Sequence, residues 1–132
     1  MIVLDTHIWI WRVNGSAELA PAKEQIIASR EREGLGVSAI SCWEIAKLVE
    51  KGRLVLSLPV DQWIDQALRY PGIRLIPLTP RMAVASTQLP QPFHKDPADQ
   101  IIVATARELD APLATDDRNI LSHPHVKLAW PN

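Results

Sequence analysis

Cysteine is nearly absent from this 132-residue chain, in which Cys42 is the only one. A single cysteine excludes an intramolecular disulfide framework and any metal site built from several cysteines. A charge excess is also lacking, because 14 Lys and Arg residues stand against 15 Asp and Glu residues, for a formal net charge of −1. No bulk field would therefore draw the chain onto a nucleic acid, and such a substrate would need a local basic rim or a bound cation.

Long apolar runs and the familiar catalytic loops are missing too. No apolar run approaches the length of a membrane span, and the first residues (MIVLD) carry no basic segment of the kind that begins a secretory signal. We therefore expect a cytoplasmic protein that does not enter a membrane. The chain has no glycine-rich phosphate loop, no Gly-x-Ser-x-Gly elbow and no His-x-x-x-His zinc pair.

The composition is that of a globular protein, with 47% hydrophobic and 22% charged residues. The length suits one domain, which we expect to comprise residues 1–132. Short apolar runs, typical of buried strands, occur at residues 2–4, 35–38, 73–76, 112–115 and 126–128, the last after a turn at His123 and Pro124. Helical patterns separate them, which predicts a three-layer α/β/α fold around a parallel sheet of about five strands.

Residues 96–106 (DPADQIIVATA) predict a central buried helix. Asp96 has the side chain of an N-cap, and Pro97 suits the first helical position, where its missing N–H is no loss. Asp99 lies in the first turn, where an acid interacts favourably with the helix dipole. The apolar run at residues 101–106 indicates that the helix packs on the sheet. Ser41 and Glu44 likewise predict a capping box at the start of another helix.

Acidic residues follow several of the predicted strands, either directly or within the first turn of the next helix: Asp5, Glu44, Asp99 and Asp117. In an open α/β sheet this carboxyl edge is where ligands bind, so these acids are expected to converge. Carboxylates at close range repel each other unless a cation compensates them. A hard cation such as Mg²⁺ or Mn²⁺ fits such a site, and it can activate a water and stabilise the charge on a phosphodiester.

Each acid also has an ordinary interpretation. Asp5 and Asp96 could be helix caps and nothing more, and Glu44 could serve simply to complete the capping box. Asp116 and Asp117 could be turn residues. What favours a metal site is the coincidence of acids at the same end of several strands.

The remaining distinctive side chains are assigned to packing. We expect the tryptophans in helical patterns to lie in the core: Trp9, Trp11, Trp43 and Trp63. Cys42 is interpreted as a small buried hydrophobic residue, and His7 and His94 as packing or rim residues rather than ligands.

Four blocks of the sequence resemble the motifs of PIN domains in VapC-type toxins. They are residues 3–7 (VLDTH), 38–46 (SAISCWEIA), 94–106 (HKDPADQIIVATA) and 112–117 (PLATDD). The blocks follow the family's order and extend across most of the chain. The resemblance implies a PIN-like fold and a Mg²⁺- or Mn²⁺-dependent endoribonuclease that hydrolyses RNA phosphodiester bonds. It also implies a homodimeric toxin of a type II toxin–antitoxin module, silenced by a cognate antitoxin protein.

The resemblance also assigns residues. The catalytic, metal-binding acids are those on the family's acidic positions, Asp5, Glu44, Asp99 and Asp117, with Asp96 as an additional metal ligand. The side chains implied to orient these carboxylates are Thr6, Ser41, Thr115 and Asp116.

The resemblance and the residues together predict a two-part antitoxin interface. A basic side chain would reach the acids, and an amphipathic helix would lie on an apolar groove formed by Trp9, Trp11 and Trp43.

Three other functions fit the sequence less well. A phospho-receiver module also gathers acids and Mg²⁺ on a parallel sheet, but it needs paired acids after the first strand and a Lys after the last. Here Thr6 follows Asp5, and Lys127 lies within the predicted last strand. A haloacid-dehalogenase-like phosphatase would need Asp-x-Asp at the first strand, where the chain has Asp-Thr-His. A non-catalytic RNA-binding PIN domain is disfavoured by the intact set of acids.

Overall fold

A computed structural model describes residues 1–122 and 125–131 of the chain. The elements occur in the order β1 (Ile2–Leu4), α1 (Thr6–Asn14), α2 (Pro21–Ala28), a 3₁₀ turn (Glu31–Glu33), β2 (Leu35–Ser38), α3 (Ala39–Glu50), α4 (Val60–Ala67), β3 (Ile73–Ile76), α5 (Pro80–Ser86), α6 (Pro97–Glu108), β4 (Leu113–Ala114) and α7 (Arg118–Ser122). The alternation of strands and helices confirms the predicted α/β class.

The strands form one parallel sheet in the order β3-β2-β1-β4. The predicted fifth strand is reduced to a single parallel bridge between Leu128 and Leu113 within the described residues. Two hydrogen bonds flank that bridge: Leu113 N donates to Lys127 O at 2.8 Å, and Ala129 N donates to Leu113 O at 2.9 Å. The predicted turn at His123 and Pro124 lies outside the described residues.

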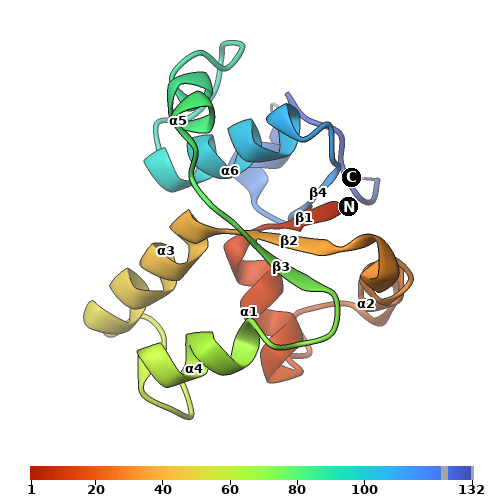
Figure 1. Cartoon of the computed structure of the whole chain (residues 1–132), viewed down its shortest axis with the longest axis vertical. Coiled ribbons are helices and arrows are strands. Elements are labelled where there is room, and N and C mark those ends of the chain that lie inside the picture. Colours follow the sequence, from red (N-terminus) through yellow and green to blue (C-terminus); the bar gives the residue numbers. More distant parts are fainter. Residues whose placement is uncertain (123–124, 132) are drawn as a thin grey trace.

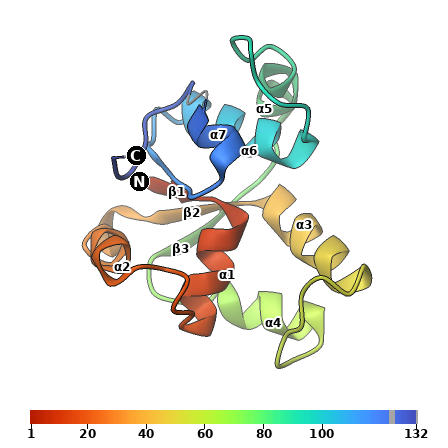
Figure 2. The same ribbon diagram turned by 180° about the vertical axis from the view of Figure 1, so that it is seen from behind.

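Helices cover both faces of the sheet. The helices α5 and α6 lie on one side, and α1, α3 and α4 lie on the other (Figure 1). The view from behind shows α7 beside α6 (Figure 2). Because side chains alternate along a strand, Ile2 and Leu4 of β1 enter the core beneath α1, whereas Val3 enters the core beneath α6. The three-layer arrangement therefore follows from short strands that are apolar on both faces.

The helix α3 begins three residues earlier than the capping box predicted. Ser38 is the N-cap, and its hydroxyl accepts a hydrogen bond from Ile40 N at 3.2 Å. Ser41 lies inside the helix and is buried. The predicted capping box between Ser41 and Glu44 is therefore wrong, because both side chains are bound to Thr6 instead.

The tryptophans divide between core and surface. Trp9 and Trp63 are buried and pack edge to face, with ring centroids 5.7 Å apart. Trp11 is partly buried against the same core. Trp43 is 54% exposed, which corrects its prediction as a core residue. Cys42 is only partly buried, although burial does raise the pKa of its thiol.

None of the helices in the described part of the chain is long and apolar enough to cross a membrane.

Candidate metal centre

The ends of two neighbouring parallel strands, the second turn of α3 and the first turn of α6 supply the acids. Asp5 follows β1 and is the N-cap of α1, where Oδ1 accepts from Thr6 N at 2.8 Å. Asp117 follows β4 and accepts from the backbone N–H groups that begin α7. Glu44 lies in α3, which follows β2 directly, and Asp99 lies in the first turn of α6. Parallel strands thus bring residues from distant parts of the chain to one edge, as predicted.

Asp99 is the residue common to two groups of potential ligands. Its carboxylate lies with His94 and Asp117 in one group and with Glu44 and Asp96 in the other. Within each group, one ligand atom per residue lies within 4.8 Å of the others. The cap of α6 fixes this position, because Asp96 Oδ1 accepts from Asp99 N at 3.1 Å.

The environment of Asp99 opposes its negative charge. Burial, which is the largest cause, and the neighbouring charges of Asp5, Asp96 and Asp117 together raise the pKa of Asp99 from 3.8 to about 7. The hydrogen bond from His94, whose Nε2 lies 2.6 Å from Asp99 Oδ2, acts in the opposite direction on this pKa. A bound cation would favour the charged form of this carboxyl group, which burial and the neighbouring acids oppose.

A hydroxyl cluster holds Glu44 in place. The Thr6 hydroxyl donates to Glu44 Oε1 at 2.6 Å and shares a hydrogen bond with Ser41 Oγ at 2.8 Å. Burial raises the pKa of Glu44, while the Thr6 hydrogen bond lowers it. Both hydroxyl residues are buried, so Glu44 is oriented by a fixed support rather than by solvent.

Thr115 connects Asp5 with Asp117. Its hydroxyl donates to Asp5 Oδ2 at 2.7 Å and accepts from Asp117 N at 3.0 Å. Burial raises the pKa of Asp5, against the effect of its hydrogen bonds from Thr115 and Thr6. Asp5 belongs to neither ligand group, but its charge helps to raise the pKa of Asp99 and of Glu44. Its ligand role therefore stays a prediction.

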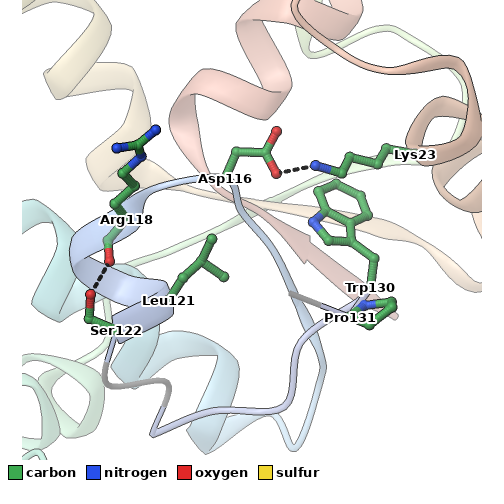
Figure 3. Close-up of a pocket in the computed structure, with 7 residues that line it drawn as sticks. All are labelled: Lys23, Asp116, Arg118, Leu121, Ser122, Trp130 and Pro131. Atoms are coloured by element: carbon green, nitrogen blue, oxygen red, sulfur yellow. Dashed lines mark hydrogen bonds and ion pairs between the residues drawn. The ribbon is translucent and has the colours of Figure 1, made fainter.

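Asp116 faces a different part of the molecule from its neighbour Asp117. It forms an ion pair with Lys23 of α2 at 2.7 Å, at the wall of a pocket that also includes Trp130 (Figure 3). Lys23 Nζ lies 5.3 Å from the centroid of the Trp130 ring. The Trp130 indole N–H donates to Thr115 O at 3.1 Å, so these contacts fix the loop that presents Thr115 and Asp117. Asp116 therefore pairs with Lys23 rather than with another acid of the site, and its predicted role in orienting a carboxylate would act only through this loop.

The donor set suits a hard divalent cation. Carboxylate oxygens from several elements meet at one edge of the sheet; Asp99 is buried, Glu44 and Asp117 are partly buried, and Asp96 is exposed. Mg²⁺ and Mn²⁺ prefer such oxygen ligands and retain waters for exchange with a phosphate. The residues therefore fit a cation at either of two positions. Asp99 and Asp117 would hold it at one, where His94 is a further ligand compatible with Mn²⁺, and Asp99, Glu44 and Asp96 would hold it at the other.

His94 is the site residue that the sequence analysis missed. It was assigned to packing or the rim, yet its imidazole contacts Asp99 and stacks on Phe93 with ring centroids 4.6 Å apart. His94 lies five residues before Asp99 in a proline-containing loop, and the spacing of apolar residues does not predict the path of a loop. The available signal was its place in the block that carries Asp96 and Asp99.

A parallel α/β/α fold with acids at the carboxyl edge defines the class of this protein, and the chain belongs to the PIN domain family, which it matches over residues 2–125. It is similar to Ribonuclease VapC22 of Mycobacterium tuberculosis, with 37% identity over 126 residues, covering 96% of this chain and 94% of the relative. This likeness confirms the predicted VapC-like PIN domain.

The chain is also similar in fold to solved structures of toxin–antitoxin proteins. VapBC2 from Rickettsia felis, bound to a DNA fragment from its promoter, contains a chain with a TM-score of 0.71 at 17% identity, with 97% of each chain covered. A toxin–antitoxin complex from Klebsiella pneumoniae contains one with a TM-score of 0.66 at 20% identity, with all of each chain covered. At these identities the likeness confirms the PIN-like fold.

Proposed function

We propose that this chain is a metal-dependent endoribonuclease and the toxin of a type II toxin–antitoxin module. The observation that carries the proposal is the convergence of Glu44, Asp96, Asp99 and Asp117 in two groups that share Asp99, in a chain 37% identical to a ribonuclease of the VapC family. Asp5 completes the proposed catalytic set from the end of β1.

In the proposed mechanism, the chain's residues form a rigid acidic edge against which a phosphodiester is positioned. A bound Mg²⁺ or Mn²⁺ would supply Lewis-acid stabilisation of the phosphate and lower the pKa of a water. Thr6 and Thr115 hold Glu44 and Asp5 in fixed orientations. His94 holds Asp99 and can carry a proton at Nε2 on the same side of the site.

One contact disfavours the receiver alternative. A receiver needs a Lys that reaches the phosphorylated acid. Lys127 Nζ instead pairs with Asp110 at 2.8 Å, and Asp110 follows the C-terminal end of α6, at the opposite end of that helix from Asp99.

The direct test is cleavage of a mixture of structured RNAs by the purified chain. We expect cleavage with Mn²⁺ or Mg²⁺, none in the presence of EDTA, and recovery when Mn²⁺ is restored in excess. Acetyl phosphate with the same protein serves as the comparison for a receiver. Covalent phosphorylation without RNA cleavage would contradict the proposal.

We further propose that a cognate antitoxin inhibits the chain, that the chain acts as a homodimer, and that both proteins are cytoplasmic. The predicted antitoxin groove needs two corrections, because Trp9 is fully buried and cannot contact a partner, and Trp43 lines a different groove from Trp11. Trp11 instead lines a groove of about 520 Å³ together with Ala17, Leu19 and Pro21, between α1 and the start of α2. This groove fits an apolar helix face.

The two halves of this interface can be tested separately in the copurified complex with the protein encoded next to the chain. We expect Ala17→Glu to weaken binding by placing a charge in the Trp11 groove, whereas Ala22→Glu, on the exposed surface of α2, serves as its control. Glu44→Gln and Asp96→Asn should weaken binding if a basic side chain reaches the acids. If these two variants bind the antitoxin with unchanged affinity, the proposed contact between a basic side chain and the acids is wrong, and the proposed apolar groove is unaffected.

A further inference from the structure

A second groove borders the acids and contains features that metal binding does not use. It has a volume of about 240 Å³, and its lining includes Trp43, Lys51 and Arg53 together with Glu44 and Asp96 of the metal centre. Trp43 is 54% exposed. An exposed indole beside a candidate active site offers an aromatic face on which a nucleic-acid base can stack.

The groove follows one stripe of α3. Trp43 and Lys47 are spaced four residues apart and so share a helix face, and Glu44 adjoins the first of them. Lys51, four residues after Lys47, is the C-cap residue that follows α3. At 1.5 Å per residue, Lys51 lies about 10 Å along the helix axis from Glu44. That separation is about three times the 3.4 Å spacing of stacked nucleotides, so the two ends of the groove can contact different nucleotides of one strand.

The cations at the far end are available for a ligand. Lys47 is engaged with Glu50 at 3.0 Å. No ion pair involves Lys51 or Arg53 within residues 1–122 and 125–131, and both side chains are exposed. In a chain of net charge −1, this is a local basic rim of the kind that a nucleic-acid substrate requires.

We propose that this groove is a binding subsite for single-stranded RNA, in which an unpaired base stacks on Trp43 and backbone phosphates contact Lys51 and Arg53. The strand then passes Glu44 toward the carboxylates that hold the cation. This inference rests on the proposed ribonuclease function and adds the class of RNA that the site accepts. Aromatic stacking requires unpaired bases, which duplex RNA does not offer.

Charge complementarity favours RNA over a protein as the occupant. The groove brings the exposed indole of Trp43, the cations of Lys51 and Arg53, and two of the proposed metal ligands to one surface, which matches the base, the phosphates and the scissile bond of a strand. The Trp11 groove, by contrast, is lined mainly by apolar side chains and is the surface suited to a helix.

The test uses a fluorescein-labelled 12-nucleotide RNA pool of random sequence without stable pairing, and a duplex of the same length, each titrated with Asp99→Asn protein in Mn²⁺. Trp43→Ala, Trp43→Phe and Trp43→Leu are made in this background. Lys51→Gln with Arg53→Gln forms a second variant, matched by Arg32→Gln in the 3₁₀ turn that precedes β2, at the opposite edge of the sheet. Cleavage of the same RNA is measured for each substitution in the wild-type background.

We expect Trp43→Ala and Trp43→Leu to weaken single-strand binding by roughly 5- to 150-fold, and Trp43→Phe to retain most of it. The double cation variant should lower the slope of log affinity against log salt by about 1.4, from about 0.7 per lost phosphate contact. Arg32→Gln should change neither, and the duplex should bind more weakly than the single strand. Melting curves should match for all these surface variants.

The outcomes separate the subsite from the proposed function. RNA binding and cleavage that survive all three Trp43 substitutions would overturn the subsite and leave the ribonuclease proposal standing. If Trp43→Ala weakens antitoxin binding but leaves RNA binding and cleavage unchanged, the subsite is likewise overturned and the surface belongs to the protein partner. A wild-type chain that neither binds nor cleaves RNA would overturn both proposals.

Discussion

Asp99→Asn is expected to lower RNA cleavage by about a thousandfold while the protein stays folded, because a metal ion's stabilisation of a phosphoryl transition state is worth several kcal/mol and each 1.36 kcal/mol is tenfold in rate. Asp99 belongs to both ligand groups, so its removal affects every cation position that the site offers. The change keeps the side-chain volume and removes a charge that burial already disfavours. Single-turnover cleavage of a fixed RNA measures the loss.

The same variant should be more stable than the wild type when no metal is present. Neutralising Asp99 removes repulsion with Asp5, Asp96 and Asp117. Asp65→Asn is the matched control, since Asp65 is exposed on α4 and forms no ion pair within the described residues. It should change neither cleavage nor melting temperature. Wild-type turnover by a folded Asp99→Asn protein would refute the assignment of Asp99.

Much of the fold could be predicted because its signals are local. The run at residues 2–4 is apolar throughout, as a strand covered on both faces must be, and β1 lies there. The Asp96-Pro97 pair carries its own capping chemistry, and α6 begins at Pro97 as predicted. The outermost strand beside β4 was less predictable, because Leu128 makes a single bridge within the described residues and no local pattern distinguishes a bridge from a strand.

The candidate site was predictable where parallel-strand topology decides the outcome. Asp5 and Asp117 follow strands that are neighbours in the sheet, so their approach needs no knowledge of side chains. The partners of Ser41 and Glu44 were not predictable, because both bind the hydroxyl of Thr6, which lies 35 residues before Ser41 and 38 before Glu44. The exposure of Trp43 was equally hidden, since a helical pattern gives the spacing of residues and not which face another element covers.

The stability of the metal-free protein should fall as pH rises from about 4 to about 7. Burial and neighbouring charges raise the pKa of folded Asp99 to about 7, from an ordinary value of 3.8. Between these values the folded state holds a proton that the unfolded state has lost. The free energy of unfolding therefore decreases with increasing pH in this window, and it levels above it. Thermal melting in EDTA at half-unit pH intervals measures this decrease. Asp99→Asn should remove the part due to Asp99, and a smaller decrease should remain because burial also raises the pKa of Asp5 and Glu44.

A divalent cation should reverse that trend, because it competes with the same proton. A metal ligand must be deprotonated, so the cation binds weakly below pH 6 and more tightly as pH passes 7. At about a hundred times its dissociation constant, Mn²⁺ should add roughly 2.7 kcal/mol to the free energy of unfolding. For a domain of this size that corresponds to roughly 10 °C in melting temperature. We expect the increase to be large at pH 8, small at pH 5.5 and nearly lost in Asp99→Asn, whereas Asp65→Asn should respond like the wild type. If millimolar Mn²⁺ leaves the melting temperature unchanged at pH 8, then neither of the two groups of potential ligands that share Asp99 holds a cation.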